Sequence, residues 1–340
     1  SRGIPYGTDG RNYFSQEMIG EELGGKPWQT HPWLQFYAAA ASYALFGVAT
    51  FSTRAPFALF GLLAVAAVYA LAREQFRSKR TALIAAGLAS VSVPFLILCR
   101  QGRYYSAVTL FFLLSLWGYT RLINGCRQSV WVLIVAATLT FHSYHPACFV
   151  LLTGLVIHAA LFHRDKLKPL FAALAVVAAV NLPWLLWLRA YPIRNHHVLG
   201  ASRIMGVLPM LKGNFDVFLA ASCVMAATLV VLVLRGAARK QYPAGMRDLI
   251  DPVCLHIIMI AGVVAASLIP NVPFFRYLAP AIPLFCILAA VVASAAFEAR
   301  PLFGAAVIAA LVVTQPLHKL VHEITHEFKG PMEGIVRHLN

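Results

Sequence analysis

The feature that most constrains this sequence is a series of long apolar runs, because each is long enough, or nearly so, to cross a lipid bilayer. In a bilayer every main-chain polar group must be paired internally, so these runs predict helices. Only 12% of the residues are charged, against about 25% in a typical soluble domain, which excludes a soluble globular protein. The sequence therefore predicts an all-α, polytopic transmembrane bundle of about ten spans. The runs fall at residues 55–73, 81–98, 107–120, 129–144, 147–162, 169–188, 213–234, 249–269, 277–297 and 302–317.

Basic clusters in alternate connections set the orientation of the bundle. One set of connections holds half of the 28 Lys and Arg residues in the shorter total loop length, and the positive-inside rule places it in the cytoplasm. The clusters are Arg73/Arg77/Lys79/Arg80, Arg121/Arg127, Arg164/Lys166/Lys168, Arg235/Arg239/Lys240/Arg247 and Arg300. The extracytoplasmic segments are then 1–54, 99–106, 189–212, 270–276 and 318–340.

The apolar segment 32–48 needs a separate decision, because an eleventh span there would invert every later loop. It is short for a span, and it carries Gln35, Ser42 and aromatic residues near its ends. We expect a helix that lies in the outer interface. The predicted organisation is a first extracytoplasmic loop over 1–54 with this juxtamembrane helix, a transmembrane bundle over 55–317, and the start of a truncated extracytoplasmic domain over 318–340.

The formal net charge of +15 raises the question of nucleic-acid binding. The basic residues lie in short clusters between apolar runs, which is typical of membrane loops and favours anionic lipid over nucleic acid as the partner. The six cysteines are scattered singly and predict neither disulfides nor a zinc site. Asp251 lies at the cytoplasmic start of a span rather than at mid-membrane, which disfavours a pump or an ion-coupled transporter.

Polar residues gather at the predicted outer edge, where four turns repeat Arg or His beside Tyr. One interpretation is an interfacial belt of anchoring residues. The other is a site in which guanidinium and phenol groups hold a lipid phosphate by charge-assisted hydrogen bonds. The turns carry Arg100, Arg103, Tyr104 and Tyr105; His142, Tyr144 and His145; Arg189, Tyr191, Arg194, His196 and His197; and Arg276 and Tyr277.

Histidines and acids give weaker signals. His142 and His145 are three residues apart and would share a face if they lie on one helix, so either a divalent metal or a lipid headgroup could be their ligand. The histidines His318, His322 and His326 are typical of an amphipathic surface helix, although their spacing also resembles a metal-binding stripe. A general base for an extracytoplasmic reaction would come from the first segment or from Asp216, and Asp9 is one candidate there.

The order of several short motifs resembles the GT-C superfamily of glycosyltransferases. It is similar in particular to bacterial relatives of dolichyl-phosphate-mannose protein mannosyltransferases and of the aminoarabinose transferases that modify lipid A. The motifs are G-I-P-Y-G-T-D-G-R-N, H-P-x-L at His31, L-F-G with the following R-x-P at Arg54, the R-Y-Y turn at Arg103, and R-Y-L-A-P-A-I-P at Arg276. Each motif is weak alone, and their order and spacing carry the resemblance.

The resemblance implies a helical membrane enzyme that acts on the extracytoplasmic face. Such enzymes pass a sugar from a polyprenyl-phosphate donor to a protein, lipid or glycan with inversion. An acidic residue in the first outer loop activates the acceptor, and basic residues hold the lipid phosphate, sometimes with a divalent cation. The usual acidic motif precedes the G-I-P stretch, so we expect the first span and the catalytic Asp to precede Ser1. Asp9 is the nearest acid, and His31 falls where relatives place a basic lipid-phosphate contact or a metal-adjacent group.

The resemblance thus implies a glycosyltransferase in the bacterial inner membrane, with a periplasmic site. The predicted lipid-phosphate ligands are Arg100, Arg103, Tyr104, Tyr105, Arg276, Tyr277 and His31. Two alternatives stay open, namely a non-catalytic GT-C-like subunit of a larger membrane complex and a transporter of lipid-linked sugars. The spans show little of the internal polarity that a transport path needs.

Overall fold

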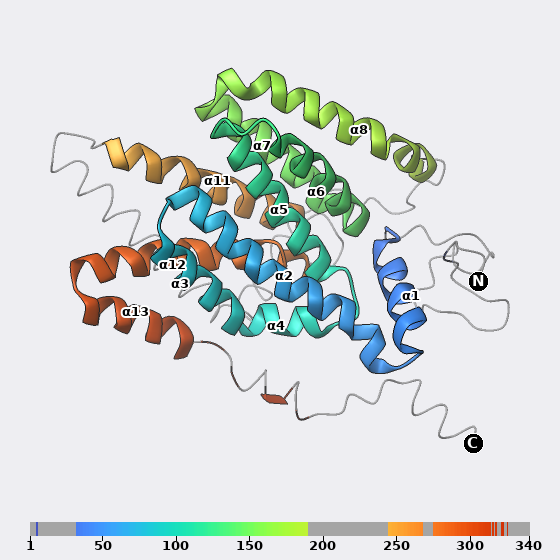
Figure 1. The fold of residues 1–340 in the computed structure, drawn as a ribbon, viewed down its shortest axis with the longest axis horizontal. Coiled ribbons are helices and arrows are strands. Elements are labelled where there is room, and N and C mark those ends of the chain that lie inside the picture. Colours follow the sequence, from blue (N-terminus) through green and yellow to red (C-terminus); the bar gives the residue numbers. More distant parts are fainter. Residues whose placement is uncertain are drawn as a thin grey trace, which may run out of the picture.

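The chain folds into a bundle of antiparallel helices, which confirms the predicted all-α class (Figure 1). The computed structural model describes residues 32–189, 244–267 and 275–313, with a few single residues elsewhere. Within these ranges every regular element is a helix. The α-helices are α1 (Leu34–Phe46), α2 (Thr50–Phe76), α3 (Lys79–Val91), α4 (Val93–Arg100), α5 (Tyr105–Ile123), α6 (Ser129–Ser143), α7 (His145–Phe162), α8 (Leu167–Arg189), α11 (Ala244–Ser267), α12 (Ala281–Ala299) and α13 (Pro301–Val313). Two short 3-10 helices are η2 (Arg164–Lys166) and η3 (Phe275–Leu278).

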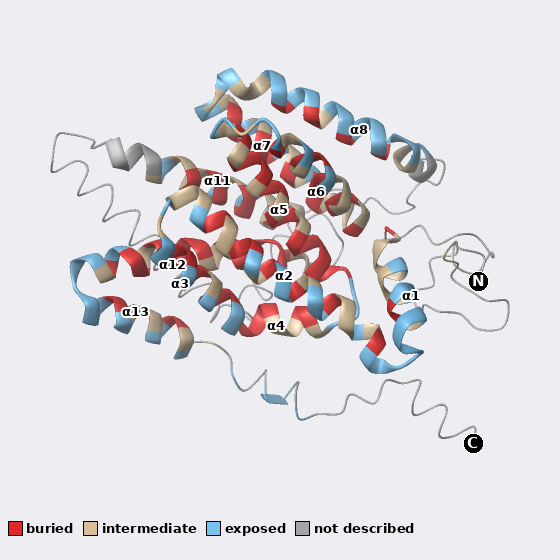
Figure 2. Cartoon of the chain, viewed as in Figure 1, coloured by how far each residue is buried: buried red, intermediate tan, exposed pale blue. Residues whose placement is uncertain are grey.

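The bundle has two ends, which we name after one residue each. The Tyr104 end carries the turns at 101–104, at Tyr144 and at η3, and the Asp251 end carries the turns at 77–78, 124–128 and 163–166. Figure 2 shows burial concentrated on α5 and its neighbours, while α8 and α13 turn exposed faces outward. An exposed apolar face on a peripheral helix is what contact with lipid requires.

Six described helices are long and apolar enough to cross a membrane. They coincide with the predicted spans at 55–73, 107–120, 147–162, 169–188, 249–269 and 277–297. The predicted spans 129–144 and 302–317 appear as the shorter apolar helices α6 and α13. The predicted span 213–234 lies outside the described residues, so the total of ten stays a prediction.

The predicted span 81–98 is divided in the structure into α3 and α4 with a bend of 58°, and the two helices together are long and apolar enough to form one broken span. Ser92 between them is extended, with φ −67° and ψ 108°. Pro94 would clash with the preceding turn of a continuous helix, but it is accommodated in the first turn of a new one. The N–H of Val93, freed by the break, donates to Oε1 of Gln315 at 3.3 Å.

The segment predicted as a juxtamembrane helix forms α1, which crosses the Tyr104 end at a steep angle to α2 (Figure 1). Gly47, with φ +74°, ends α1 and allows the sharp turn into α2. The hydroxyl groups of Tyr43 and Thr53 are 2.8 Å apart and fix this corner. Leu45 is 77% exposed and Phe46 is 62% exposed, a pattern that favours an interfacial position. The place of α1 in the membrane interface stays a prediction.

Candidate lipid-phosphate site

Four tyrosines from three separate turns meet at the Tyr104 end. The rings of Tyr104 and Tyr105 contact each other edge to face, with centroids 4.6 Å apart. Tyr144 stacks on Tyr104 at 5.0 Å and on Tyr277 at 5.8 Å, so that its ring lies between the other two. The three turns are far apart in the sequence, and the antiparallel helices bring them to one end of the bundle.

Local sequence explains why Tyr144 reaches this position. Its backbone is extended, with φ −158° and ψ 101°, which ends α6 after Ser143 and starts α7 at His145. Pro146 lies in the first turn of α7, where its missing N–H costs nothing. The side chain of Tyr144 is therefore directed from a corner between two helices rather than from a helix face.

Arg276 supplies the positive charge of the cluster. It precedes Tyr277 in η3, its side chain hydrogen-bonds the Tyr277 hydroxyl, and its guanidinium carbon lies 5.6 Å from the Tyr277 ring centroid. It also interacts electrostatically with Tyr105 and Tyr104. A half-buried guanidinium among phenol groups is suited to bind a phosphate, because the anion can accept from both types of donor.

Burial keeps the phenols of this cluster in their neutral form. It raises the pKa of Tyr104 and of Tyr144 well above the ordinary tyrosine value, and the neighbouring tyrosines act in the same direction. Arg276 opposes this effect at both hydroxyls. Tyr104 and Tyr144 therefore retain an O–H that can be donated to an anion at neutral pH.

Some polar atoms near the cluster are buried without a hydrogen-bond partner. They include Nη1 of Arg100 at the end of α4, Oη of Tyr105 and Oγ of Ser106. A buried polar group usually has a partner, and leaving it without one costs about 1–3 kcal/mol. A polar ligand at this end of the bundle would supply such partners.

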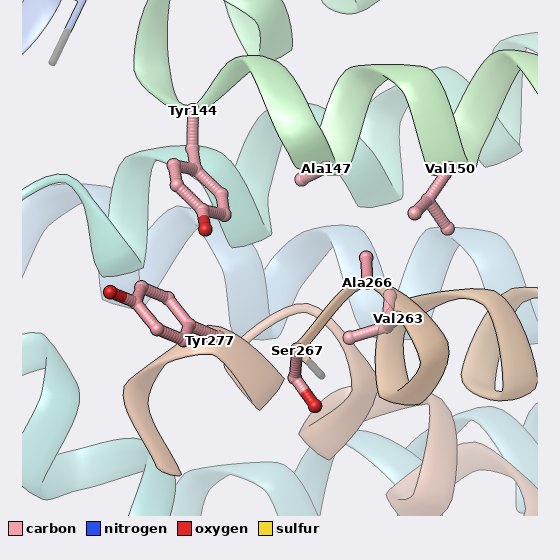
Figure 3. Close-up of a pocket in the computed structure, with 7 residues that line it drawn as sticks. All are labelled: Tyr144, Ala147, Val150, Val263, Ala266, Ser267 and Tyr277. Carbon is pink, nitrogen blue, oxygen red and sulfur yellow. The ribbon is translucent and has the colours of Figure 1, made fainter. Parts of the chain in front are cut away.

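An apolar groove between α7 and α11 begins at the tyrosines (Figure 3). Tyr144 and Tyr277 border one end, and the rest of the lining is Ala147, Val150, Val263, Ala266 and Ser267. The cavity volume is only about 10 Å³, roughly the space of one water molecule, so in this structure the groove is a small apolar depression. The groove and the cluster together therefore offer an apolar surface with a polar, cationic head.

The structure brings together four of the predicted ligands, namely Tyr104, Tyr105, Arg276 and Tyr277. Arg100 ends α4 one turn before Tyr104, and Arg103 lies exposed on the intervening turn. The predicted ligand His31 and the predicted catalytic acid Asp9 lie outside the described residues.

The predicted metal pair His142 and His145 does not share a helix face. The helix ends between them, so His142 belongs to α6 and His145 to α7. The ring of His142 packs edge to face against Trp184 at 5.8 Å. A spacing of three residues aligns two side chains only on a continuous helix. The chain turns at Tyr144, between the two histidines, so their spacing does not place them on one face.

Sequence reasoning noted Tyr144 in its turn but did not include it among the phosphate ligands, and it missed the groove entirely. The Tyr-rich turn F-H-S-Y-H-P was the available signal for Tyr144. For the groove there was none, because Ala147 and Val263 look like any other membrane-helix residues. Their role depends on the pairing of α7 with α11, which lie about a hundred residues apart in the chain.

The fold and this site define an integral membrane protein with antiparallel apolar helices and a polar aromatic cluster at one end. Residues 30–187 match the family described as dolichyl-phosphate-mannose-protein mannosyltransferase. An uncharacterized protein of Aquifex aeolicus (strain VF5) is 28% identical over 153 residues, which are 45% of this chain and 31% of that protein.

Two solved structures of ArnT from Cupriavidus metallidurans share the fold. The structure bound to undecaprenyl phosphate superposes with a TM-score of 0.59 at 18% identity, and the apo structure with 0.58 at 17%. Each match covers 79% of this chain and 50% of ArnT, so the chain spans about half the length of these solved relatives. The predicted resemblance to the GT-C superfamily, and to its mannosyltransferase and aminoarabinose transferase relatives, is confirmed.

Proposed function

We propose that this chain belongs to a membrane glycosyltransferase that takes a sugar from a polyprenyl-phosphate donor and transfers it, with inversion, to an extracytoplasmic acceptor. One observation carries the proposal: the cluster of Tyr104, Tyr144, Tyr277 and Arg276 lies at the mouth of an apolar groove. A polyprenyl phosphate has the same two parts, an isoprenoid chain and an anionic head. The ArnT structure with undecaprenyl phosphate supports this class of donor.

The proposed chemistry is a direct displacement at the anomeric carbon. The acceptor hydroxyl forms the new C–O bond while the bond from the sugar to the lipid phosphate breaks, and the electron pair leaves with the phosphate. Arg276 and the hydroxyls of Tyr104 and Tyr277 stabilise the charge that develops there. The proton of the acceptor passes to a carboxylate of the first extracytoplasmic loop, for which Asp9 is the candidate in this chain.

The groove accounts for the lipid part of the donor. Its wall of Ala147, Val150, Val263 and Ala266 presents methyl groups to the first isoprene units next to the phosphate. Burial of such surface contributes about 25 cal/mol per Å², so the groove adds affinity without contacting the reacting bond. The positive-inside distribution of basic loops supports an extracytoplasmic, periplasmic position for the site.

The proposal is tested by measuring sugar transfer by the full-length protein in lipid nanodiscs with a polyprenyl-phosphate sugar donor. We expect Arg276→Ala to reduce the transfer rate on the order of 10²–10³-fold, as for the loss of one transition-state donor. Arg127→Ala is the matched control, because Arg127 is exposed at the Asp251 end. Equal transfer rates for Arg276→Ala and Arg127→Ala would rule out Arg276 as a ligand of the donor phosphate.

The same preparation separates the alternatives. Binding of the lipid phosphate without transfer to any acceptor would identify a non-catalytic GT-C-like subunit, and its co-purification in a stable complex would name its partners. Movement of labelled lipid across the bilayer with its sugar bond intact would identify a transporter.

A further inference from the structure

A second polar cluster lies at the Asp251 end of the same two helices that line the groove. His158 lies on α7, His163 directly follows α7, and Asp251 is on α11. Oδ1 of Asp251 is 2.7 Å from Nε2 of His163 and 3.5 Å from Nε2 of His158. In the described ranges this is the one group of three or more His, Cys, Asp or Glu residues whose ligand atoms all lie within 4.8 Å of one another.

One pair of these atoms has the spacing that a tetrahedral metal ion requires, and all three pairs lie within 4.8 Å. Metal bonds of roughly 2.0–2.1 Å to nitrogen and oxygen place neighbouring ligand atoms about 3.4 Å apart. The 3.5 Å distance from His158 to Asp251 already matches. The distance from His163 must widen, and His163 has the freedom to move because it lies beyond the end of α7 with its side chain 25% exposed.

The surroundings of His158 suit a metal ligand. Its side chain is fully buried, and its second ring nitrogen, Nδ1, is 2.9 Å from the hydroxyl of Tyr119 on α5. Ligating histidines almost always use their other ring nitrogen in such a hydrogen bond, which fixes the ring orientation. With Nε2 on a metal, the proton of the neutral ring lies on Nδ1 and is donated to Oη of Tyr119.

An ion can reach the cluster and keep one water ligand. The side chains of Asp251 and His163 are 27% and 25% exposed, so the cluster opens on one side while His158 closes the other. In this structure Nε2 of His158 is 3.0 Å from the main-chain oxygen of Asp251. Metal binding would replace this hydrogen bond with a coordinate bond.

We propose that His158, His163 and Asp251 bind a divalent transition-metal ion of the Zn²⁺ type, with water as the fourth ligand. Two imidazoles and one carboxylate favour Zn²⁺ over Mg²⁺ and Ca²⁺, which prefer oxygen ligands. The ion clamps α7 to α11 at the end opposite the groove. The site is distinct from the cation that the GT-C resemblance implies, since that cation accompanies the lipid phosphate at the Tyr104 end.

Close helix packing gives the clamp a consequence for the groove. Gly154 of α7 faces the side chain of Met259, and Gly262 of α11 faces the side chain of Val150. Helices that approach this closely move as a pair, so fixing their register at Asp251 also fixes the spacing between Val150 and Val263 in the groove wall.

The test uses the full-length protein, purified in detergent, stripped with a chelator and titrated with Co²⁺ as a spectroscopic probe. We expect one Co²⁺ per chain with visible absorption bands typical of tetrahedral coordination, which added Zn²⁺ abolishes. Zn²⁺ should also raise the unfolding temperature. Both effects should be lost in His163→Gln and Asp251→Asn and retained in His256→Gln, a matched control because His256 is also a buried α11 histidine but hydrogen-bonds Gln75.

A second variant keeps the test decisive if removal of a ligand disturbs folding. Asp251→Cys retains a ligand, so its Co²⁺ complex should gain a near-ultraviolet thiolate-to-cobalt band that the unsubstituted protein lacks. Cys254 is present in both proteins and cancels in the difference spectrum. Absence of Co²⁺ binding by the folded, unsubstituted protein would overturn the proposal, as would Asp251→Cys binding Co²⁺ without the new band. The cluster would then be only a hydrogen-bond network between α7 and α11.

Discussion

The rings of Tyr144 and Tyr277 are parallel to within 2°, with their centroids 5.8 Å apart. One residue comes from the corner between α6 and α7, and the other from η3, just before α12. The stacked pair joins two separate parts of the chain and forms the border between the polar cluster and the apolar groove. Both the shape and the chemistry of the proposed donor site depend on it.

The stacking and the hydroxyl of Tyr277 can be separated by mutation. Tyr277→Phe keeps the ring on Tyr144 and removes one hydrogen-bond donor, so we expect transfer to slow with an increase in barrier of up to about 3 kcal/mol. Tyr277→Ala also removes the ring contact and should lower the unfolding temperature. Rates and thermal unfolding of the two variants, measured together, check this. A Phe variant as fast as the parent protein would show that the hydroxyl contacts no reacting group.

A bulky side chain in the groove should weaken donor binding. Ala266 lines the groove, while the preceding residue, Ala265, is exposed and lies about 100° away around α11. We expect Ala266→Phe to raise the KM for a polyprenyl-phosphate donor at least several-fold, because the new ring occupies the space of an isoprene unit. Ala265→Phe should leave KM unchanged. A similar KM for both variants would place the lipid chain elsewhere.

Close helix contact makes Gly118 hard to replace. A Cβ atom there would lie 2.8 Å from the main-chain nitrogen and 3.2 Å from the Cα of Leu133, so α5 and α6 would have to separate. We expect Gly118→Ala to destabilise the protein by about 1–3 kcal/mol, as overpacking does. Gly87→Ala meets no atom within 4 Å and should be neutral or stabilising by up to about 1 kcal/mol. The unfolding temperatures of Gly118→Ala and Gly87→Ala, measured in the same detergent, check this prediction. Equal unfolding temperatures would contradict the close contact between Gly118 and Leu133.

The raised pKa of the cluster tyrosines predicts a loss of stability in alkali. An unfolded tyrosine ionises near pH 10, whereas burial raises the pKa of Tyr104 and Tyr144 in the folded state. Above about pH 10 the unfolded state therefore binds fewer protons, and the free energy of unfolding falls as the pH rises. We expect Tyr144→Phe to reduce the steepness of this fall between about pH 10 and 12. An unchanged slope would mean that Tyr144 ionises freely when folded.

The order of the helices could be predicted from the sequence, because each apolar run is bounded by charged or Pro/Gly segments and the bilayer fixes its minimum length. The division at Ser92 could not be predicted in the same way. Pro94, after Ser90 and Ser92, is a local signal for a break inside this mostly apolar run, but the break is also compensated by Gln315, a partner more than 200 residues away. Local pattern does not contain such a partner.

The sequence could predict which turns carry the residues of the candidate site, but it could not predict how those residues are arranged in space. The R-Y-Y and F-R-Y-L motifs identified Tyr104, Tyr105, Arg276 and Tyr277, which do converge. The prediction that His142 and His145 share a face assumed one continuous helix, but the chain turns at Tyr144 and places them on two helices. The cluster of His158, His163 and Asp251 depends on the register between α7 and α11, and only tertiary packing sets that register.

The hydrogen bond from Val93 to Gln315 has a mechanical consequence. It attaches the chain just beyond α13 to the first residue of α4, a helix of eight residues that ends at Arg100. Substitution of Gln315 by Leu would leave the N–H of Val93 without this partner at the break before α4. The bend between α3 and α4 therefore depends on a residue that follows α13, so a change at Gln315 affects the start of the helix that ends at Arg100.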